Sequence, residues 1–223
     1  MNPYIKICLL LLINYFCFTL AGVWFGILSL GITIYKILSL LGITKTPIIN
    51  LGHFAEGITY TKDYLGSYSK QRDAFMEALK LIETFKLQDF AIIALYYDTP
   101  GKVEESKQRC SIGLYKKKSF ENKESEEFEK YCQENGYNKN ELPNCRALYS
   151  NWDYLNFAAM IVGIQKFYKM LESNLKNDEF KKKYSIDESK ITVSLEVYEN
   201  MNSMSFYIPI ENGDKFLIFK KDQ

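Results

Sequence analysis

The sequence has few of the residues that most enzyme and metal sites use. It holds one histidine, His53, and five cysteines. It contains no HExxH motif, no glycine-rich phosphate loop and no cluster of Cys and His at metal-ligand spacing. A lone histidine more often makes a local hydrogen bond than takes part in chemistry, and no Ser-His-Asp set can be assembled around it. We therefore predict no catalytic residue, no metal and no cofactor, and we expect a protein that is not an enzyme.

An excess of positive charge is also missing. The chain has 28 Lys and Arg against 27 Asp and Glu, and three of the lysines (Lys6, Lys36 and Lys45) precede position 50. The remainder is slightly acidic, so it offers no basic field for nucleic acid, and we exclude nucleic acid as a partner.

Signs of a secreted domain are absent as well. No asparagine stands in an N-x-S/T sequon, and the cysteines after position 50 are odd in number and have no CxxC spacing: Cys110, Cys132 and Cys145. Secreted domains usually pair their cysteines. Both observations favour a domain on the cytosolic or matrix side of a membrane.

Residues 7–35 contain no charged side chain, and the first acidic residue is Glu56. About 20 apolar residues suffice to cross a bilayer, so we predict a single tilted transmembrane helix, flanked by Lys6 and Lys36. Trp24 lies mid-segment in this prediction and is expected to pack rather than to anchor at the interface. Two helices would require a longer run, to residue 43, and a cramped turn.

Other interpretations of this segment stay open. Thr19-Leu20-Ala21 resembles a signal-peptide cleavage site, although the apolar run continues well beyond it. Small residues at spacings of four and three would let another helix approach closely: Gly22, Gly26 and Ser29. Lysines at both ends leave the orientation weakly determined. We assign residues 1–46 to the anchor and its linker, and residues 47–223 to one domain.

The pattern of this domain is strand, helix, strand, strand, and it occurs twice. The first unit runs from a strand at 53–62 through a helix at 69–85, with Ser69 as its N-cap, to strands near 91–97 and 110–114. An acidic surface helix at 125–135 follows, ended by Gly136. The second unit runs from a strand at 146–152 through a helix at 154–174 to strands at 191–198 and 206–210, of which Pro209 suggests an edge strand. Residues 216–219 form a possible last strand.

Two units of this kind predict an α+β domain with antiparallel pairing and helices on one face of the sheet. The segment Ala94-Leu95-Tyr96-Tyr97-Asp98 aligns with Leu195-Glu196-Val197-Tyr198-Glu199, each at a strand end. The open face of the sheet needs cover or a ligand, and we expect tyrosines there: Tyr60, Tyr96 or Tyr97, Tyr115 and Tyr198. The carboxylates Asp98 and Glu199 fit turn-initiating positions better than a catalytic pair.

Several motifs resemble the gyrase-inhibitor-like, or effector-binding, domains. Tyr60 with Gly66-Ser67-Tyr68 is similar to their first-strand motif, and Leu195-Glu196-Val197-Tyr198 followed by Phe206-Tyr207-Ile208-Pro209-Ile210 is similar to their closing pair. With the anchor, the order of motifs resembles the testis-expressed ER-phagy receptor family. Further similar segments are Ala94-Leu95-Tyr96-Tyr97-Asp98-Thr99-Pro100, Arg109-Cys110-Ser111-Ile112-Gly113 and Gly213-Asp214-Lys215-Phe216-Leu217.

This resemblance implies a groove in which a carboxylate among aromatic rings binds a small cationic or aromatic molecule. Glu196 is the carboxylate carried over, with Tyr60, Tyr96, Tyr115 and Tyr198 around it. The alternative for Glu196 is a solvated strand residue. The receptors also carry an acidic tail with an aromatic-x-x-aliphatic motif. Here Tyr207-Ile208-Pro209-Ile210 matches that motif, but it lies in a predicted strand, and a strand already paired in a sheet cannot readily pair with another protein.

We therefore expect a membrane-anchored, non-enzymatic binding or adaptor protein in the endoplasmic reticulum membrane, with a cytosolic domain. Its partners would be the bilayer, other proteins and possible small ligands. One alternative is an accessory structural subunit of a large membrane complex, for example a respiratory complex of the mitochondrial inner membrane. Another is a small-molecule sensor or hydrolase that uses the groove.

Overall fold

The structure is a computed structural model that describes residues 3–20, 23–99, 102–119, 125–200 and 202–220. The chain forms two compact units. The first, here called the anchor unit, comprises Met1–Ile48 and Trp152–Glu172. The second, here called the β-domain, comprises Ile49–Asn151 and Ser173–Gln223. The boundary at residues 46 and 47 stays a prediction.

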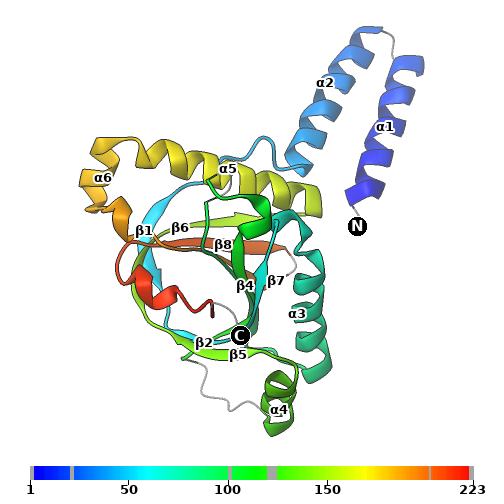
Figure 1. Ribbon diagram of the computed structural model, residues 1–223. Coiled ribbons are helices and arrows are strands. Elements are labelled where there is room, and N and C mark those ends of the chain that lie inside the picture. The colour runs from blue at the N-terminus through cyan, green and yellow to red at the C-terminus, as the bar shows by residue number, and fades with distance from the viewer. Residues whose placement is uncertain (1–2, 21–22, 100–101, 120–124, 201, 221–223) are drawn as a thin grey trace. The chain divides into compact units, whose positions relative to one another are not determined.

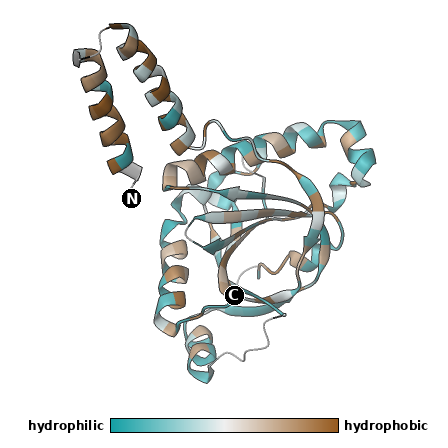
Figure 2. Ribbon diagram, turned by 180° about the vertical axis from the view of Figure 1, so that it is seen from behind, coloured by the Kyte–Doolittle hydropathy of each residue, from teal (hydrophilic) through white to brown (hydrophobic). Residues whose placement is uncertain are grey.

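The apolar N-terminal segment forms two helices that pack against each other, α1 (Pro3–Leu20) and α2 (Val23–Leu40). Both are apolar along most of their length (Figure 2). Among the described residues, α2 is the one helix long and apolar enough to span a membrane, and residues 5–19 form a shorter apolar helix. The prediction of one continuous helix over residues 7–35 is wrong, because the chain reverses near its middle. Trp24 consequently lies in the first turn of α2, with 82% of its surface exposed, and is not a packing residue.

Lysine side chains join the end of α2 to α5 (Phe157–Leu175) inside the anchor unit. The Lys166 ammonium donates hydrogen bonds to the carbonyls of Gly42 at 3.3 Å, Ile43 at 2.5 Å and Lys45 at 2.5 Å. The Lys45 ammonium in turn donates to the Asp153 carbonyl at 3.0 Å. Carbonyls beyond a helix C-terminus lack partners within the helix, and the lysine supplies both the donors and a favourable charge there.

The β-domain is built on one eight-stranded antiparallel sheet that curls strongly (Figure 1). Its spatial order is β1-β6-β8-β7-β3-β4-β2-β5. The strands are β1 (Asn50–Phe54), β2 (Gly57–Leu65), β3 (Phe90–Tyr96), β4 (Arg109–Lys117), β5 (Asn138–Leu142), β6 (Cys145–Asp153), β7 (Ser194–Asn200) and β8 (Ser203–Pro209). The predicted α+β class and its doubled strand-helix-strand-strand pattern are confirmed, as β2-α3-β3-β4 and β6-α5-β7-β8.

The sequence prediction did not separate the short strand β1 from β2, and it did not include the short strand β5. Each precedes the first strand of its own half, β2 or β6, and pairs with the corresponding strand of the other half: β1 with β6, and β5 with β2. The halves therefore exchange their first strands. β1 and β5, rather than β8, form the edges of the sheet. The prediction that Pro209 marks an edge strand is wrong, because Pro209 is the last residue of an interior strand.

Three helices accompany the strands of the β-domain: α3 (Arg72–Phe85), α4 (Glu126–Glu134) and α6 (Asp178–Tyr184). The N-cap of α3 is Gln71, not Ser69, because a short 3-10 turn over Tyr68–Lys70 precedes the helix. Ser125 caps α4 as its position predicts, and accepts a hydrogen bond from the Phe128 N–H at 3.2 Å. Residues 216–219 form no strand. A 3-10 turn, η4 (Gly213–Phe216), is followed by chain that is neither helix nor strand up to residue 220.

The sheet has two distinct faces, and both are covered. The face that packs against α3, here called the α3 face, carries Leu114 and Tyr60 together with Ala78 and Leu81 of the helix. The opposite, concave face carries a second core that contains Ile93, Leu95, Leu195, Val197 and Phe216. Figure 1 shows η4 inside the curl of the sheet, so the C-terminal segment fills the concave side.

Candidate functional site

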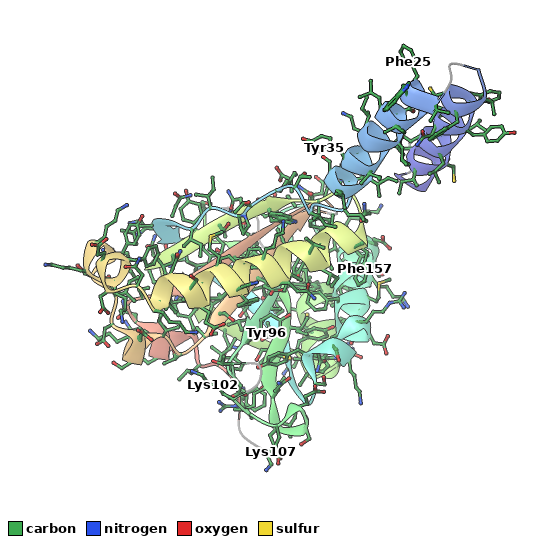
Figure 3. All side chains as sticks on the ribbon, turned by 90° about the horizontal axis from the view of Figure 1, so that it is seen from above. Phe25, Tyr35, Tyr96, Lys102, Lys107 and Phe157 are labelled. Atoms are coloured by element: carbon green, nitrogen blue, oxygen red, sulfur yellow. The ribbon has the colours of Figure 1, made fainter. Side chains whose placement is uncertain are left out.

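Glu196, Tyr96 and Tyr198 come together on the α3 face at the centre of the sheet. Glu196 is 2% exposed. The hydroxyl of Tyr198 donates a hydrogen bond to Glu196 Oε2 at 2.6 Å, and that of Tyr96 donates to the same oxygen at 3.4 Å. A carboxylate removed from water must be hydrogen-bonded or paired to be tolerated. We call these three residues the Glu196 cage; Tyr96 is labelled in Figure 3.

Strand register explains why these residues meet. Ala94 of β3 lies opposite Glu196 of β7, and Ile92 lies opposite Tyr198. Residues directly opposite in a ladder share a face, and so do residues two apart on one strand. Tyr96 is thus on the same face as Glu196 and diagonal to it. The small Ala94 side chain between them leaves room for both tyrosine rings to turn toward the carboxylate.

Two further aromatic rings extend the cage. Phe75 of α3 packs edge-on against Tyr198 at 5.3 Å between ring centroids, and Tyr68 packs against Tyr96 at 4.8 Å. The Tyr68 hydroxyl is held by the carbonyls of Asp98 and Arg109, both at 3.0 Å. Burial raises the pKa of Tyr68 above its ordinary value, so that it remains a neutral donor. The sequence offered Phe75 only as part of the buried stripe of its helix.

Tyr60, also predicted for the groove, belongs to a separate cluster. It lies on the α3 face but packs against Phe128 of α4, with ring centroids 5.0 Å apart. Its hydroxyl donates to Glu129 Oε1 at 3.1 Å, and Lys139 donates to the same oxygen at 2.5 Å. The Lys139 hydrogen bond, followed by that of Tyr60, lowers the pKa of Glu129. Tyr60 therefore fastens α4 to the sheet.

Tyr115 lies on the opposite, concave face. It is 2% exposed, packs on Phe54, and donates a hydrogen bond to the Ala55 carbonyl at 2.7 Å. The expectation that all of these tyrosines lie on the helix-free face is wrong: Tyr97 and Tyr115 lie there, on the concave face, but Tyr60, Tyr96 and Tyr198 lie on the α3 face. Successive residues of a strand point to opposite faces of the sheet. In the β2–β4 and β3–β4 ladders Leu114, not Tyr115, lies opposite Tyr60 and Ile92. The prediction that these residues bind a ligand stays a prediction.

The concave face holds a hydrogen-bonded chain that the sequence prediction missed. Ser111 donates to Asp63 Oδ1 at 2.5 Å, and the Ser111 and Tyr97 hydroxyls are 2.8 Å apart. The backbone N–H of Lys220 donates to the other Asp63 oxygen at 3.0 Å. Burial raises the pKa of Tyr97. Residues so far apart in sequence are brought together only by strand pairing, which no local pattern encodes.

The strand-end carboxylates form ion pairs. Asp98 makes a two-pronged pair with Arg109, with Oδ1 to Nη2 at 2.8 Å and Oδ2 to Nε at 3.0 Å, and the Arg109 hydrogen bonds lower the pKa of Asp98. Glu199 pairs with Lys117 at 3.1 Å. His53 is exposed on β1. Among the described residues, no group of three or more His, Cys, Asp or Glu side chains is arranged to hold a metal ion.

Of the small residues predicted to pack in the anchor, Gly26 meets a helix of its own chain. A Cβ built on Gly26 would lie 2.3 Å from the Phe18 ring of α1. Ser29 is partly buried on α2. Gly22 lies outside the described residues. A partner helix from another protein stays a prediction.

No protein-family model matches the chain, and no curated protein is significantly similar to it. Solved structures with similar folds exist. The C-terminal domain of EcmrR is 12% identical with a TM-score of 0.43, covering 75% of this chain and 99% of its own. SAV2435 bound to tetraphenylphosphonium is 11% identical with a TM-score of 0.47, covering 74% and 94%. A hydrolase from Listeria innocua is 10% identical with a TM-score of 0.43, covering 75% and 94%.

The resemblance of the motifs to effector-binding, gyrase-inhibitor-like domains stays a prediction. The relation to the ER-phagy receptor family finds no support among these neighbours. Tyr207-Ile208-Pro209-Ile210, the motif-like segment, begins in strand β8, where Tyr207 pairs with Leu195. The exclusion of nucleic acid stays a prediction. At such identities and TM-scores, the neighbours say nothing of what this chain binds.

Proposed function

We propose that this chain is a membrane-anchored, non-enzymatic binding protein whose β-domain takes a small organic cation at the Glu196 cage. The observation that carries the proposal is the burial of Glu196 among aromatic side chains in the middle of the sheet. A buried carboxylate costs stability unless its surroundings compensate, and such residues are often retained for function.

The chemistry of the cage suits a cation with apolar substituents. The carboxylate supplies the charge, and the faces of Tyr96, Tyr198, Tyr68 and Phe75 supply cation–π attraction and apolar contact. An arriving cation would replace tyrosine hydroxyls as the partner of Glu196. A small ligand enters this face by displacement of the first turns of α3, which contribute Ala74 and Phe75 to the cover.

Membrane anchorage is proposed from the surface of α1 and α2. Large apolar side chains are exposed on both helices, for example Leu12 at 53% on α1, and Trp24 at 82% and Phe25 at 65% on α2. Soluble proteins rarely expose many large apolar side chains together, and where they do the surface marks a contact with a membrane or a protein. Figure 3 shows Phe25 and Tyr35 projecting from α2. The location in the endoplasmic reticulum, or in the mitochondrial inner membrane, stays a prediction.

The test is titration of the full chain in detergent micelles with tetraphenylphosphonium, chosen because it is a cation enclosed by four phenyl rings. We expect saturable binding to the wild type. Glu196→Gln keeps the shape and one acceptor but removes the charge, and should weaken binding at least tenfold, which corresponds to about 1.4 kcal/mol. The matched control is Glu199→Gln, three residues along the same strand at an exposed ion pair, and should bind as the wild type does.

Melting temperature separates a ligand site from a structural residue. If Glu196 binds the cation, tetraphenylphosphonium should raise the melting temperature of the wild type and of Glu199→Gln but not that of Glu196→Gln. If Glu196 is only structural, the ligand should shift the melting temperatures of all three proteins equally. Equal binding by the two Gln variants, or partitioning without saturation in the wild type, would refute the proposal.

A further inference from the structure

The N-terminal anchor consists of two helices that contact each other, and not of a single spanning helix. α1 and α2 are each 18 residues long and are in contact, although only residues 21 and 22 separate them in sequence. Two helices of about 27 Å joined so closely can touch along their length only if they run antiparallel. Figures 1 and 2 show them side by side as a hairpin.

The packing inside the hairpin agrees with this. Phe18 lies three residues before position 21, Gly26 lies four after position 22, and the ring of the first covers the second. Asn14 and Thr33, which are also placed on either side of the break, are 5% and 3% exposed. The polar side chains thus face the neighbouring helix and the apolar ones face outward, which is the arrangement that lipid requires.

The charges lie at one end of the hairpin. Lys6 is the fourth residue of α1, and Lys36 is the fifth residue from the end of α2. In an antiparallel pair both are at the open end, Lys45 follows in the linker, and no charge lies between residues 7 and 35 at the closed end. A single span would instead divide the lysines, with Lys6 on one side and the other two on the opposite side.

We infer that α1 and α2 form a hairpin that enters and leaves the bilayer on the same side. The residues before α1 and the β-domain after α2 then share one compartment, the one that retains lysines, which is the cytosol or its equivalent. Insertion of the hairpin transfers no charged side chain across the hydrocarbon. Exposed Trp24 is placed at the far end, where indole rings favour the membrane interface. This inference rests on the proposed membrane anchorage.

The experiment is cysteine labelling of the full chain in sealed, uniformly oriented membrane vesicles with a membrane-impermeant maleimide. Cys8→Ser and Cys17→Ser remove the thiols of the hairpin. The remaining cysteines are buried, and burial raises the pKa of each thiol to about 12, so they should not react with the maleimide: Cys110, Cys132 and Cys145. Single probes are then placed before α1 (Asn2→Cys), at the closed end (Trp24→Cys), in the linker (Thr46→Cys) and on the β-domain (Lys107→Cys).

We expect Asn2→Cys, Thr46→Cys and Lys107→Cys to label from the same side of the membrane. Trp24→Cys should not label from that side. Labelling of Asn2→Cys from the side opposite to Thr46→Cys would establish a single span and overturn the hairpin, while leaving the anchorage intact. Release of a shortened chain by alkaline carbonate would overturn the anchorage itself. Extraction and labelling therefore separate the two failures.

Discussion

Replacing Asp98 with asparagine should lower the stability of the β-domain at neutral pH and have a smaller effect in acid. Asp98 follows β3, and its carboxylate accepts three hydrogen bonds from the first residue of β4: from Arg109 N at 2.8 Å, Nε at 3.0 Å and Nη2 at 2.8 Å. The side chain of Asp98 is 9% exposed. The pair thus closes the connection between two central strands.

The magnitude follows from what asparagine keeps. Its carbonyl oxygen can still accept from the Arg109 backbone N–H, but the charge and the two-pronged geometry are lost. A hydrogen bond to a charged group contributes about 1.5–3 kcal/mol, and the 39% exposure of the Arg109 side chain places the loss toward the lower end because water screens the pair. We expect about 2 kcal/mol, which for a chain of this size lowers the melting temperature by about 4–8 °C.

The pH dependence gives the sharper check. Arg109 holds the pKa of Asp98 below its ordinary value of 3.8, so the folded state binds this proton less readily than the unfolded state. The carboxylate therefore contributes its full stability above about pH 4–5, and the contribution is lost as the pH falls through the folded pKa. The wild type should approach the variant as the pH falls, because protonation of Asp98 removes the charge that asparagine lacks.

The measurement is thermal unfolding of the full chain in detergent, followed by circular dichroism at pH 7 and pH 3. The control is Asp214→Asn in η4, an exposed carboxylate that should change the melting temperature by less than about 1–2 °C. A loss for Asp98→Asn that is equally large at both pH values would show that shape, and not charge, holds the connection, and would refute the reasoning.

Three further outcomes are expected. Gly113→Ala should prevent the β-domain from folding, as seen by loss of its circular dichroism, because the new Cβ would fall 2.0 Å from the Tyr60 carbonyl oxygen in an adjacent strand. Lys166→Met should increase proteolysis of the linker after α2 without unfolding the β-domain, because the carbonyls of Gly42, Ile43 and Lys45 lose the Lys166 ammonium; unchanged cleavage would contradict that role. In the folded chain at pH 8, thiol reagents should leave three buried cysteines unmodified, and denaturant should release all of them: Cys110, Cys132 and Cys145.

Local patterns were enough to predict the order of helices and strands, because alternation and helical periodicity are properties of single segments. They were not enough for pairing. Alternation in β7 put Glu196 on a polar, solvated face, yet it is 2% exposed. β7 lies inside an eight-stranded sheet with cover on both faces, and the cover is supplied by elements remote in sequence.

The anchor shows the same limit. An uncharged run predicts membrane insertion by composition alone, but composition does not show whether the chain reverses within the run. The reversal of the chain between α1 and α2 is visible only from contacts such as Phe18 with Gly26. A sequence cue was present in Asn14 and Thr33, since one polar residue in each half of an apolar run suits the interface between two helices.

The face of the sheet on which each side chain lies also decides how many carboxylates are available to a ligand. The sequence comparison aligned Leu95 with Glu196, but Leu95 faces the concave core and Glu196 the α3 face, so that alignment is out of step by one residue. A shift of one residue exchanges the faces of a strand. When the strands are aligned by the faces that they share, no side chain of β3 on the α3 face is charged. These side chains are Phe90, Ile92, Ala94 and Tyr96.

The two halves of the β-domain are therefore alike in topology and unlike at their centre. The carboxylate comes from β7, while β3 contributes the small Ala94 and the ring of Tyr96 to the same cage. One carboxylate at the junction of two halves can neutralise one cation. Binding at the Glu196 cage should accordingly saturate at one cation per chain, and a second equivalent site of similar affinity would mean that the cation is held elsewhere.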